Sequence, residues 1–221
     1  MAVASTGRSR DRQGLIVNEK FFALPEEKRN AIINAGFLVF SRHEYRKAST
    51  DDVAKEAGIS KALLFHYFGS KKGFYVYLYD YAIAFLVDGL STLHDYEETD
   101  FFEILKNAQE CKLRLLVEHP DVMQFIVRGY LADGGEVSPE LDKSFQAVLA
   151  KSVESFLKRA DASKFKDSIT VKEALEIALW MSDGFMRAQT PEALSDLRAV
   201  NDEFLRYLDI LKAHFYREEC L

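Results

Sequence analysis

The sequence has 221 residues, of which 48% are hydrophobic and 29% are charged. These proportions are ordinary for a globular protein and allow one sizeable core or two small ones. The sequence has no run of about 18 apolar residues, the length that a membrane-spanning helix needs, and its N-terminus lacks the apolar stretch of a signal peptide. Composition therefore argues against membrane insertion and secretion and favours the cytoplasm.

Charge is distributed unevenly along the chain. Residues 1–74 contain 13 Lys/Arg and 8 Asp/Glu, a net charge of +5, whereas residues 75–221 contain the remaining 16 and 27, a net charge of −11. A basic end on an acidic body is expected of a protein that brings one end to a polyanion. A merely solvated surface with uneven charge would give the same balance, so charge alone leaves both interpretations open.

Apolar residues recur at intervals of three and four, and only four prolines and eleven glycines interrupt the pattern, so we expect an all-α fold. Residues 1–22 contain Arg8, Arg10 and Arg12 without apolar periodicity and are predicted to form a basic, flexible arm. The first regular helix is expected to begin at Leu24–Pro25, where a proline followed by two glutamates suits a helix N-terminus.

The stretch STDDVAKEAGISKALLFHYF, residues 49–68, predicts two short helices joined by a tight turn. Ser49 is placed to cap the first helix and Ser60 the second, while Gly58 suits the left-handed residue that ends a helix. Small residues before the turn let the two helices cross closely, as in a helix-turn-helix. Such a motif presents its second helix to a DNA major groove, although two packed core helices would give a similar pattern.

A long helix is predicted over residues 70–93, because large apolar residues fall on one stripe of this segment. Further helices are expected at residues 100–118, 120–131, 139–160, 170–189 and 192–217.

The sequence around the tight turn resembles the TetR family of one-component bacterial regulators. The family pattern has a threonine at the start of the second helix, then Ile/Val-Ala, Ala-Gly-Val/Ile-Ser, a glycine, Leu-Tyr-x-His/Tyr-Phe and a lysine. The corresponding residues here are Thr50, Val53-Ala54, Ala57-Gly58-Ile59-Ser60, Ala62, Leu64-Phe65-His66-Tyr67-Phe68 and Lys71. The match covers about residues 21–86, and beyond it only helical content and length agree.

The resemblance implies a role in DNA binding for each matched position. Thr50 and Lys71 would bind phosphates at the two edges of the site, and His66 and Tyr67 would contact the phosphate backbone. The residues implied to face the bases are Ser60, Lys61, Ala62 and Leu63. Three departures leave operator sequence and affinity open: Ala62 stands where the family has glycine, Phe65 where tyrosine is common, and Glu44 where glycine is common.

The resemblance also implies a three-helix helix-turn-helix domain joined by the long helix to a C-terminal helical domain for ligand binding and dimerisation. The expected limits are 1–22 for the arm, 23–73 for the DNA-binding domain and 74–221 for the effector-binding and dimerisation domain. Residues 100–160 mix aromatic and polar side chains, as a pocket for a small, mostly apolar molecule with one polar or anionic group would. Candidate effector contacts are Cys111, Arg114, Phe125 and Arg128, although aromatic residues at helical spacing are more often core.

The last two predicted helices carry broad apolar stripes that include small residues. The resemblance implies that these helices pair with their symmetry mates in a homodimer, although both stripes could instead be intramolecular core. The candidate interface residues are Ile177, Met181, Gly184, Phe185, Leu208 and Leu211.

The sequence thus predicts a homodimeric transcriptional regulator that binds a palindromic double-stranded DNA operator and is a repressor released by a small-molecule effector. No catalytic motif is present, and Cys111, Cys220 and the histidines lack metal-ligand spacing, so we expect no enzyme activity, metal or cofactor. Two alternatives stay open. One is a helical protein-interaction module that has kept the fold, and the other is a small-molecule carrier or enzyme acting through the middle helices.

Overall fold

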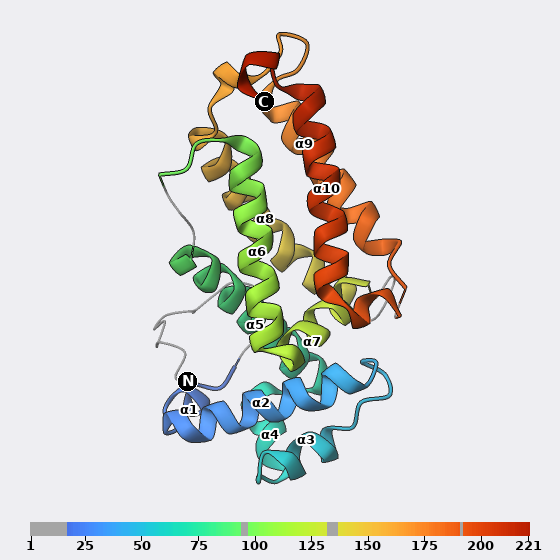
Figure 1. Cartoon of the computed structure of the whole chain (residues 1–221). Helices are drawn as coiled ribbons and strands as arrows, with labels where there is room; N and C mark the ends of the chain where they lie inside the picture. The colour runs from blue at the N-terminus through green and yellow to red at the C-terminus, as the bar shows by residue number, and fades with distance from the viewer. Residues whose placement is uncertain (1–16, 94–96, 132–136, 191) are drawn as a thin grey trace. The chain divides into compact units, whose positions relative to one another are not determined.

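The computed structural model describes residues 17–93, 97–131, 137–190 and 192–221. Within these ranges the regular structure is helical, apart from one isolated bridge between Phe165 and Tyr216, which confirms the predicted all-α fold class. The α-helices (Figure 1) are α1 (Glu19–Phe22), α2 (Glu26–Arg42), α3 (Thr50–Glu56), α4 (Lys61–Phe68), α5 (Lys71–Leu93), α6 (Phe101–Glu118), α7 (Pro120–Leu131), α8 (Ser138–Arg159), α9 (Val171–Arg187) and α10 (Leu197–Phe215). No helix in these ranges is long and apolar enough to cross a membrane.

The predicted helices agree closely with the observed ones, and the largest difference lies before α10. A single helix was expected from residue 192, whereas Ala193–Ser195 form a separate 3₁₀ turn and α10 begins at Leu197. The reason is local, because the side chain of Asp196 accepts a hydrogen bond from the backbone N–H of Ala199 over 3.1 Å and caps α10.

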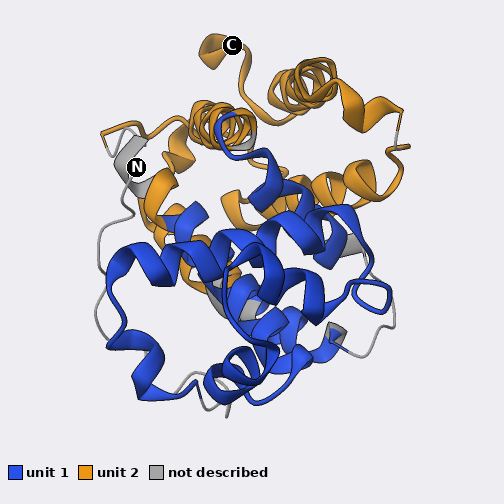
Figure 2. Ribbon diagram, turned by 90° about the horizontal axis from the view of Figure 1, so that it is seen from below, with its two compact units in different colours: residues 1–87, 118–147 blue, residues 88–117, 148–221 orange. Residues whose placement is uncertain are grey.

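The chain packs as two compact units (Figure 2). Unit 1 comprises Met1–Val87 and Glu118–Ala147, and unit 2 comprises Asp88–Val117 and Val148–Leu221. Helix α7 therefore packs with the helix-turn-helix, although it lies well beyond residue 73 in the sequence. The limits at residues 23, 73 and 74 concern functional regions and stay a prediction.

The N-terminal region contains one short helix within the predicted arm. Residues 1–16, with the three arginines of the arm, lie outside the described residues. Glu19–Phe22 form α1, and Phe21 is fully buried, with its ring centroid 4.8 Å from that of Phe68 and 5.5 Å from that of Tyr77. Residues 19–22 thus belong to the packed structure of unit 1.

Helices α2, α5 and α7 meet in the core of unit 1. A Cβ atom at Gly36 of α2 would lie 2.5 Å from Cδ1 of Leu78 in α5, so this glycine sets how closely the two helices approach. From α7, the fully buried Phe125 places its ring centroid 5.4 Å from that of Phe37 and 4.8 Å from that of Tyr75. These edge-on aromatic contacts join all three helices.

Polar contacts also tie α7 to the end of α2. The fully buried Ser41 donates its hydroxyl proton to Oδ1 of Asp121 over 2.9 Å, and Nε of Arg128 donates to the Ser41 carbonyl oxygen over 2.6 Å. The carbonyl groups in the last turn of a helix lack intrahelical partners, so Arg128 gives one of them a part-buried hydrogen bond. We call these three residues the α2–α7 clasp.

Unit 2 has its own aromatic core. Phe101 and Phe102 at the start of α6 are fully buried and pack against Phe165 and Tyr216. Backbone hydrogen bonds from Lys166 N–H to the Phe215 oxygen and from Arg217 N–H to the Lys164 oxygen hold the two later segments together. These contacts join three separate stretches of sequence, and Ala174 and Leu175 of α9 and Phe204 and Leu208 of α10 belong to the same core.

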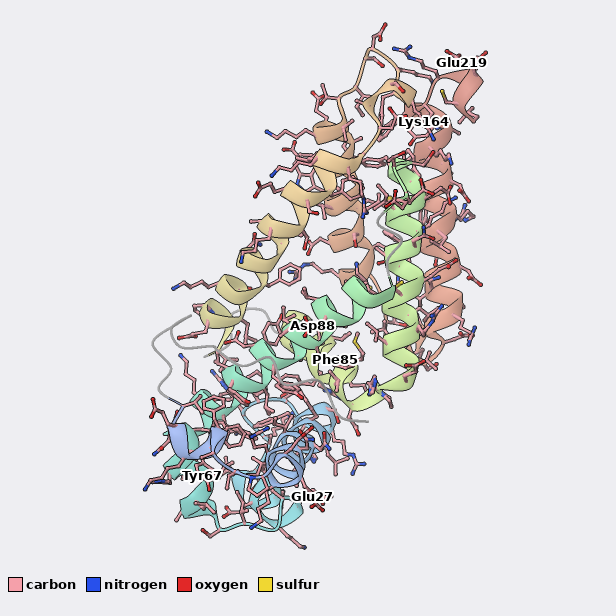
Figure 3. The ribbon with its side chains drawn as sticks, turned by 90° about the vertical axis from the view of Figure 1, so that its left-hand side faces the viewer. Glu27, Tyr67, Phe85, Asp88, Lys164 and Glu219 are labelled. Carbon is pink, nitrogen blue, oxygen red and sulfur yellow. The ribbon has the colours of Figure 1, made fainter. Side chains whose placement is uncertain are left out.

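Asp100, in unit 2, is a buried acid with 7% of its surface exposed. Its Oδ1 accepts hydrogen bonds from the Phe102 and Glu103 amides at the start of α6, and its Oδ2 accepts one from Nζ of Lys164, labelled in Figure 3, over 2.8 Å. Burial by itself would raise the pKa of Asp100, but the hydrogen bonds from Lys164 and Glu103 and the charge of Lys212 outweigh it and lower the pKa.

Asp100→Asn is expected to lower the free energy of unfolding at pH 7 by about 1–3 kcal/mol, because the half-buried Lys164 loses its negatively charged partner. A carboxylate whose pKa is lowered by folding stabilises the protein above its unfolded-state pKa of about 3.9 and stops doing so as the pH falls through the folded-state pKa. The difference between parent and variant should therefore shrink below about pH 4, as measured by urea unfolding followed by circular dichroism.

Asp167→Asn is the matched control, because the side chain of Asp167 is 96% exposed where it pairs with Arg217. This change should leave unfolding nearly unaltered at both pH values. Equal stability of the two variants at pH 7 would contradict the role given to Asp100.

Candidate nucleic-acid interface

The turn between α3 and α4 has the geometry that the sequence predicts. Oγ of Ser49 accepts from the Asp51 amide over 3.1 Å and caps α3, and Oγ of Ser60 accepts from the Leu63 amide over 3.1 Å and caps α4. Gly58 has a φ of +65°, a left-handed conformation that side chains disfavour. The predicted caps and the predicted glycine turn are therefore confirmed.

Helix α4 has a buried back and an exposed front. Leu64, Tyr67 and Phe68 are buried, with 0%, 6% and 4% of their surface exposed. Ser60, Lys61, Ala62 and His66 are exposed, and Leu63 is half-buried. The four residues predicted to face bases thus all lie in the first turn and the cap of α4, and three of them are open to solvent.

Lys61 forms an ion pair with α3. Its Nζ lies 2.8 Å from Oδ2 of Asp51, and both side chains are largely exposed. An exposed pair of this kind contributes about 0–1 kcal/mol, so a base edge or a phosphate can replace Asp51 as the partner at little cost. Asp51 therefore orients the Lys61 ammonium group along the front of α4 without fixing it there.

The residues predicted to bind phosphate differ in exposure. Thr50 is 8% exposed at the start of α3, and Tyr67 is 6% exposed at the end of α4, where Figure 3 labels it. Lys71 is half-buried, with Nζ 3.3 Å from the Arg46 carbonyl oxygen and 4.8 Å from the Tyr45 ring centroid. His66 is the most open of these residues.

Sequence reasoning missed Asn18, which contacts the end of α4. Its backbone N–H donates to the Tyr67 carbonyl oxygen over 2.9 Å, and its Nδ2 lies 3.3 Å from Nε2 of His66. Its Oδ1 also caps α1 by accepting from the Lys20 amide. An asparagine directly before Glu19 is a helix N-cap signal that could have revealed α1, but nothing local indicates the contact with α4.

The four candidate effector contacts fall in different units. Cys111 is buried and Arg114 exposed, and both lie in the part of α6 that belongs to unit 2. Phe125 and Arg128 belong to unit 1, where Phe125 is in the aromatic core and Arg128 in the α2–α7 clasp. The contacts observed for these two residues are therefore structural, and each compact unit contains only two of the four candidates.

The six candidate interface residues differ in how deeply they are buried in their own chain. Leu208 is 1% exposed and belongs to the core of its own chain, against which Met181, Phe185 and Leu211 pack while half-buried. Gly184 is exposed, and a Cβ atom there would meet nothing within 4 Å. Ile177 is half-buried and lines a hollow of about 290 Å³ together with Trp180, which is 70% exposed and which sequence reasoning missed.

Metal binding finds no support in the arrangement of side chains. Among the residues that the structure describes, no group of three or more His, Cys, Asp or Glu side chains could bind a metal ion. The exposed front of α4 therefore remains the candidate site with the clearest geometry.

Comparisons with known proteins agree with the TetR resemblance of the N-terminal region and with the helical fold. The family model described as "Bacterial regulatory proteins, tetR family" matches residues 32–78, which run from α2 into α5. An uncharacterised HTH-type transcriptional regulator of Mycobacterium tuberculosis is 22% identical over 190 residues, covering 84% of this chain and 75% of that protein.

Solved structures share the helical architecture. A TetR family transcriptional regulator from Chloroflexus aurantiacus has a TM-score of 0.64 at 20% identity, covering 92% of this chain and 100% of that chain. FadR from Bacillus subtilis, solved in complex with stearoyl-CoA, has a TM-score of 0.65 at 16% identity, covering 81% of this chain and 96% of that chain. Residues 32–78 thus match the helix-turn-helix region of the TetR family of bacterial regulatory proteins, and the chain shares the fold of solved TetR family regulators.

Proposed function

We propose that the protein is a sequence-specific DNA-binding repressor whose operator complex is released by a small-molecule effector. The observation that carries this proposal is the one-sided burial of α4, with Leu64 and Phe68 packed behind it and Ser60, Lys61 and Ala62 exposed in front. A helix that is supported from behind and open at its N-terminal end can enter a major groove and reach base edges. The base and phosphate roles predicted from the sequence are part of the proposal.

A homodimer is the second part of the proposal. The eight residues of one α4 can read few base pairs, whereas two copies related by a twofold axis read a palindrome. The half-sites would then be separated by about 34–36 Å or a multiple of that distance. Gly184 supports a close approach of two α9 helices because a Cβ atom placed there would meet no described residue within 4 Å, and the exposed Trp180 extends the same helix face.

The effector is the third part of the proposal. Residues 100–160 mix apolar and polar side chains, which suits a small, mostly apolar molecule with one polar or anionic group. FadR of Bacillus subtilis, which shares the fold at 16% identity, was solved with stearoyl-CoA, a long apolar chain joined to a larger anionic head group, so a long-chain acyl-CoA is a candidate. An effector that changes operator affinity by about 1–3 kcal/mol would change it roughly 5- to 150-fold. The helix-turn-helix would respond through α7, which the α2–α7 clasp fixes to α2.

Selection of bound fragments from random duplexes tests the DNA-binding part of the proposal, and two lysine variants test the roles of named residues. On the selected duplex, Lys71→Ala should weaken binding to all sequences alike and reduce the slope of log affinity against log salt by about 0.9, because one phosphate is no longer neutralised. Lys61→Ala should instead reduce the preference for the selected sequence, because the variant has no ammonium group to offer to a base edge. Fluorescence anisotropy at several salt concentrations measures both effects.

Lys55→Ala is the control for these variants, because Lys55 is exposed on α3 and has no predicted DNA contact. The reverse pattern, with Lys71 controlling sequence preference and Lys61 only general affinity, would overturn the two role assignments. If no duplex sequence were enriched at all, the proposed function itself would be wrong.

Gly184→Arg should convert the dimer into monomers and remove operator binding, because a long cation would enter the face where two α9 helices are proposed to meet. The fold should survive, since the position is exposed and the space around it is open. Light scattering after size exclusion measures the mass, and thermal unfolding checks the fold. Ala150→Arg, on an exposed position of α8, is the control, and a Gly184→Arg protein that remains dimeric would contradict the proposed interface.

The effector proposal predicts that a long-chain acyl-CoA displaces the selected duplex. Titration of stearoyl-CoA into the preformed complex should lower the anisotropy of a labelled duplex at micromolar concentrations, while coenzyme A alone should not. Complexes that are indifferent to stearoyl-CoA and to the free fatty acid would exclude this ligand class.

A further inference from the structure

A hollow of about 470 Å³ lies between α2 and the turn that leads into α4, and we call it the α2–α4 hollow. Ser60 and Leu63, which are predicted to face bases, form part of its wall, so it adjoins the front of α4. Lys28 and Ile32 line it from α2, and all of these residues belong to unit 1. A duplex bound to the front of α4 would therefore bring one DNA strand next to this hollow.

The polar side chains that line the α2–α4 hollow can all donate hydrogen bonds. They are Lys28, Ser60 and Tyr67, and the other described lining residues are apolar or glycine, so no carboxylate is among them. Oγ of Ser60 already accepts from the Leu63 amide over 3.1 Å, which leaves its hydroxyl proton available to an acceptor. Three donors without an acid beside them suit an anion.

Tyr67 offers a hydroxyl group that lacks a partner. The residue is only 6% exposed, and its ring centroid lies 5.7 Å from that of the fully buried Phe21. Its backbone carbonyl oxygen accepts from the Asn18 amide over 2.9 Å, whereas its hydroxyl forms no hydrogen bond with any residue that the structure describes. Because buried polar groups nearly always have a hydrogen-bond partner, this rigidly held donor indicates a ligand in the hollow.

Lys28 offers a positive charge that is not neutralised within the described part of the chain. The residue is exposed and forms no ion pair there. By contrast, Lys61 pairs with Asp51 and Lys72 with Glu140 in the same unit. Lys28 also lies in the first turn of α2, where the helix dipole disfavours a cation, so helix stability does not explain its position.

We propose that the α2–α4 hollow binds one phosphate of the DNA backbone, with Nζ of Lys28 and the hydroxyl groups of Tyr67 and Ser60 donating to the phosphate oxygens. The apolar part of the wall, including Ile59 and Leu63, would pack against the adjoining sugar. This inference rests on the proposed DNA-binding function and adds α2 to the surface that contacts DNA. Such a contact fixes the position of α4 in the groove and reads no base.

Lys28→Ala in the full-length protein tests the inference first. The variant should bind the selected duplex roughly 3- to 10-fold more weakly at about 0.15 M salt, and its slope of log affinity against log salt should fall by about 0.9, because one phosphate is no longer neutralised. Sequence preference should be unchanged. Thermal unfolding should match that of the parent protein, because Lys28 is exposed and alanine favours a helix.

Two matched variants control for charge. Lys55→Ala removes the same charge from an exposed position of α3 that does not line the hollow, and it should bind like the parent protein. Lys28→Arg keeps the charge at the hollow and should keep the parental salt slope. A Lys55→Ala protein that loses as much affinity as Lys28→Ala would show an effect of net charge alone and would overturn the inference.

Duplexes with a methylphosphonate at one position of both half-sites locate the phosphate, because this group replaces a charged oxygen by a methyl group. At one such position the substitution should weaken the parent protein but should not weaken Lys28→Ala further, which is the coupling that a double-mutant cycle measures. Tyr67→Phe retains the ring that packs against Phe21 and lacks only the hydroxyl. This variant should couple to the same phosphate position as Lys28→Ala.

Parental affinity and salt slope in Lys28→Ala would overturn the inference while leaving operator binding intact. Coupling of Lys28 and Tyr67 to different phosphates, or of Lys28 to none, would do the same. In contrast, a parent protein that enriches no duplex sequence would remove the proposed DNA-binding function itself. The two failures are therefore distinguishable.

Discussion

The packing behind α4 is the interaction on which the rest of the structure depends. An isolated helix of eight residues is unstable in water, so α4 must be held by its neighbours to keep any shape. Leu64 and Phe68 supply that support from one side only, which leaves the cap and first turn open. The same burial that makes the helix rigid also determines which of its side chains can face a partner.

The packing that supports the helix-turn-helix also includes α7. Phe125 packs in the core with α2 and α5, and the α2–α7 clasp satisfies a carbonyl group at the end of α2. A displacement of α7 must therefore either move α2 with it or break part-buried hydrogen bonds and buried aromatic contacts. Under the proposed function, Arg128 would transmit an effector signal by its contact with Ser41, whereas the sequence suggested that it would touch the effector itself.

Local sequence signals predicted the helices and the turn well, because caps, a glycine turn and apolar periodicity are each determined by residues that lie close together in the sequence. Ser49, Gly58 and Ser60 were identified in this way, and most helix ends were placed within one or two residues. Contacts between distant segments were not predicted, because periodicity shows that Phe125 is apolar but not which core receives it. The contact of Asn18 with Tyr67 spans 49 positions, and the burial of Leu208 and the exposure of Trp180 likewise depend on tertiary packing.

The central claim is that two copies of α4 read the major groove of one duplex. Interference by methylation of guanine N7, an atom that lies in the major groove, tests this claim on a duplex selected by the protein. The account predicts two clusters of interference whose centres are separated by about 34–36 Å or a multiple of that distance. A selected duplex with no major-groove interference, or with one unpaired cluster, would contradict it.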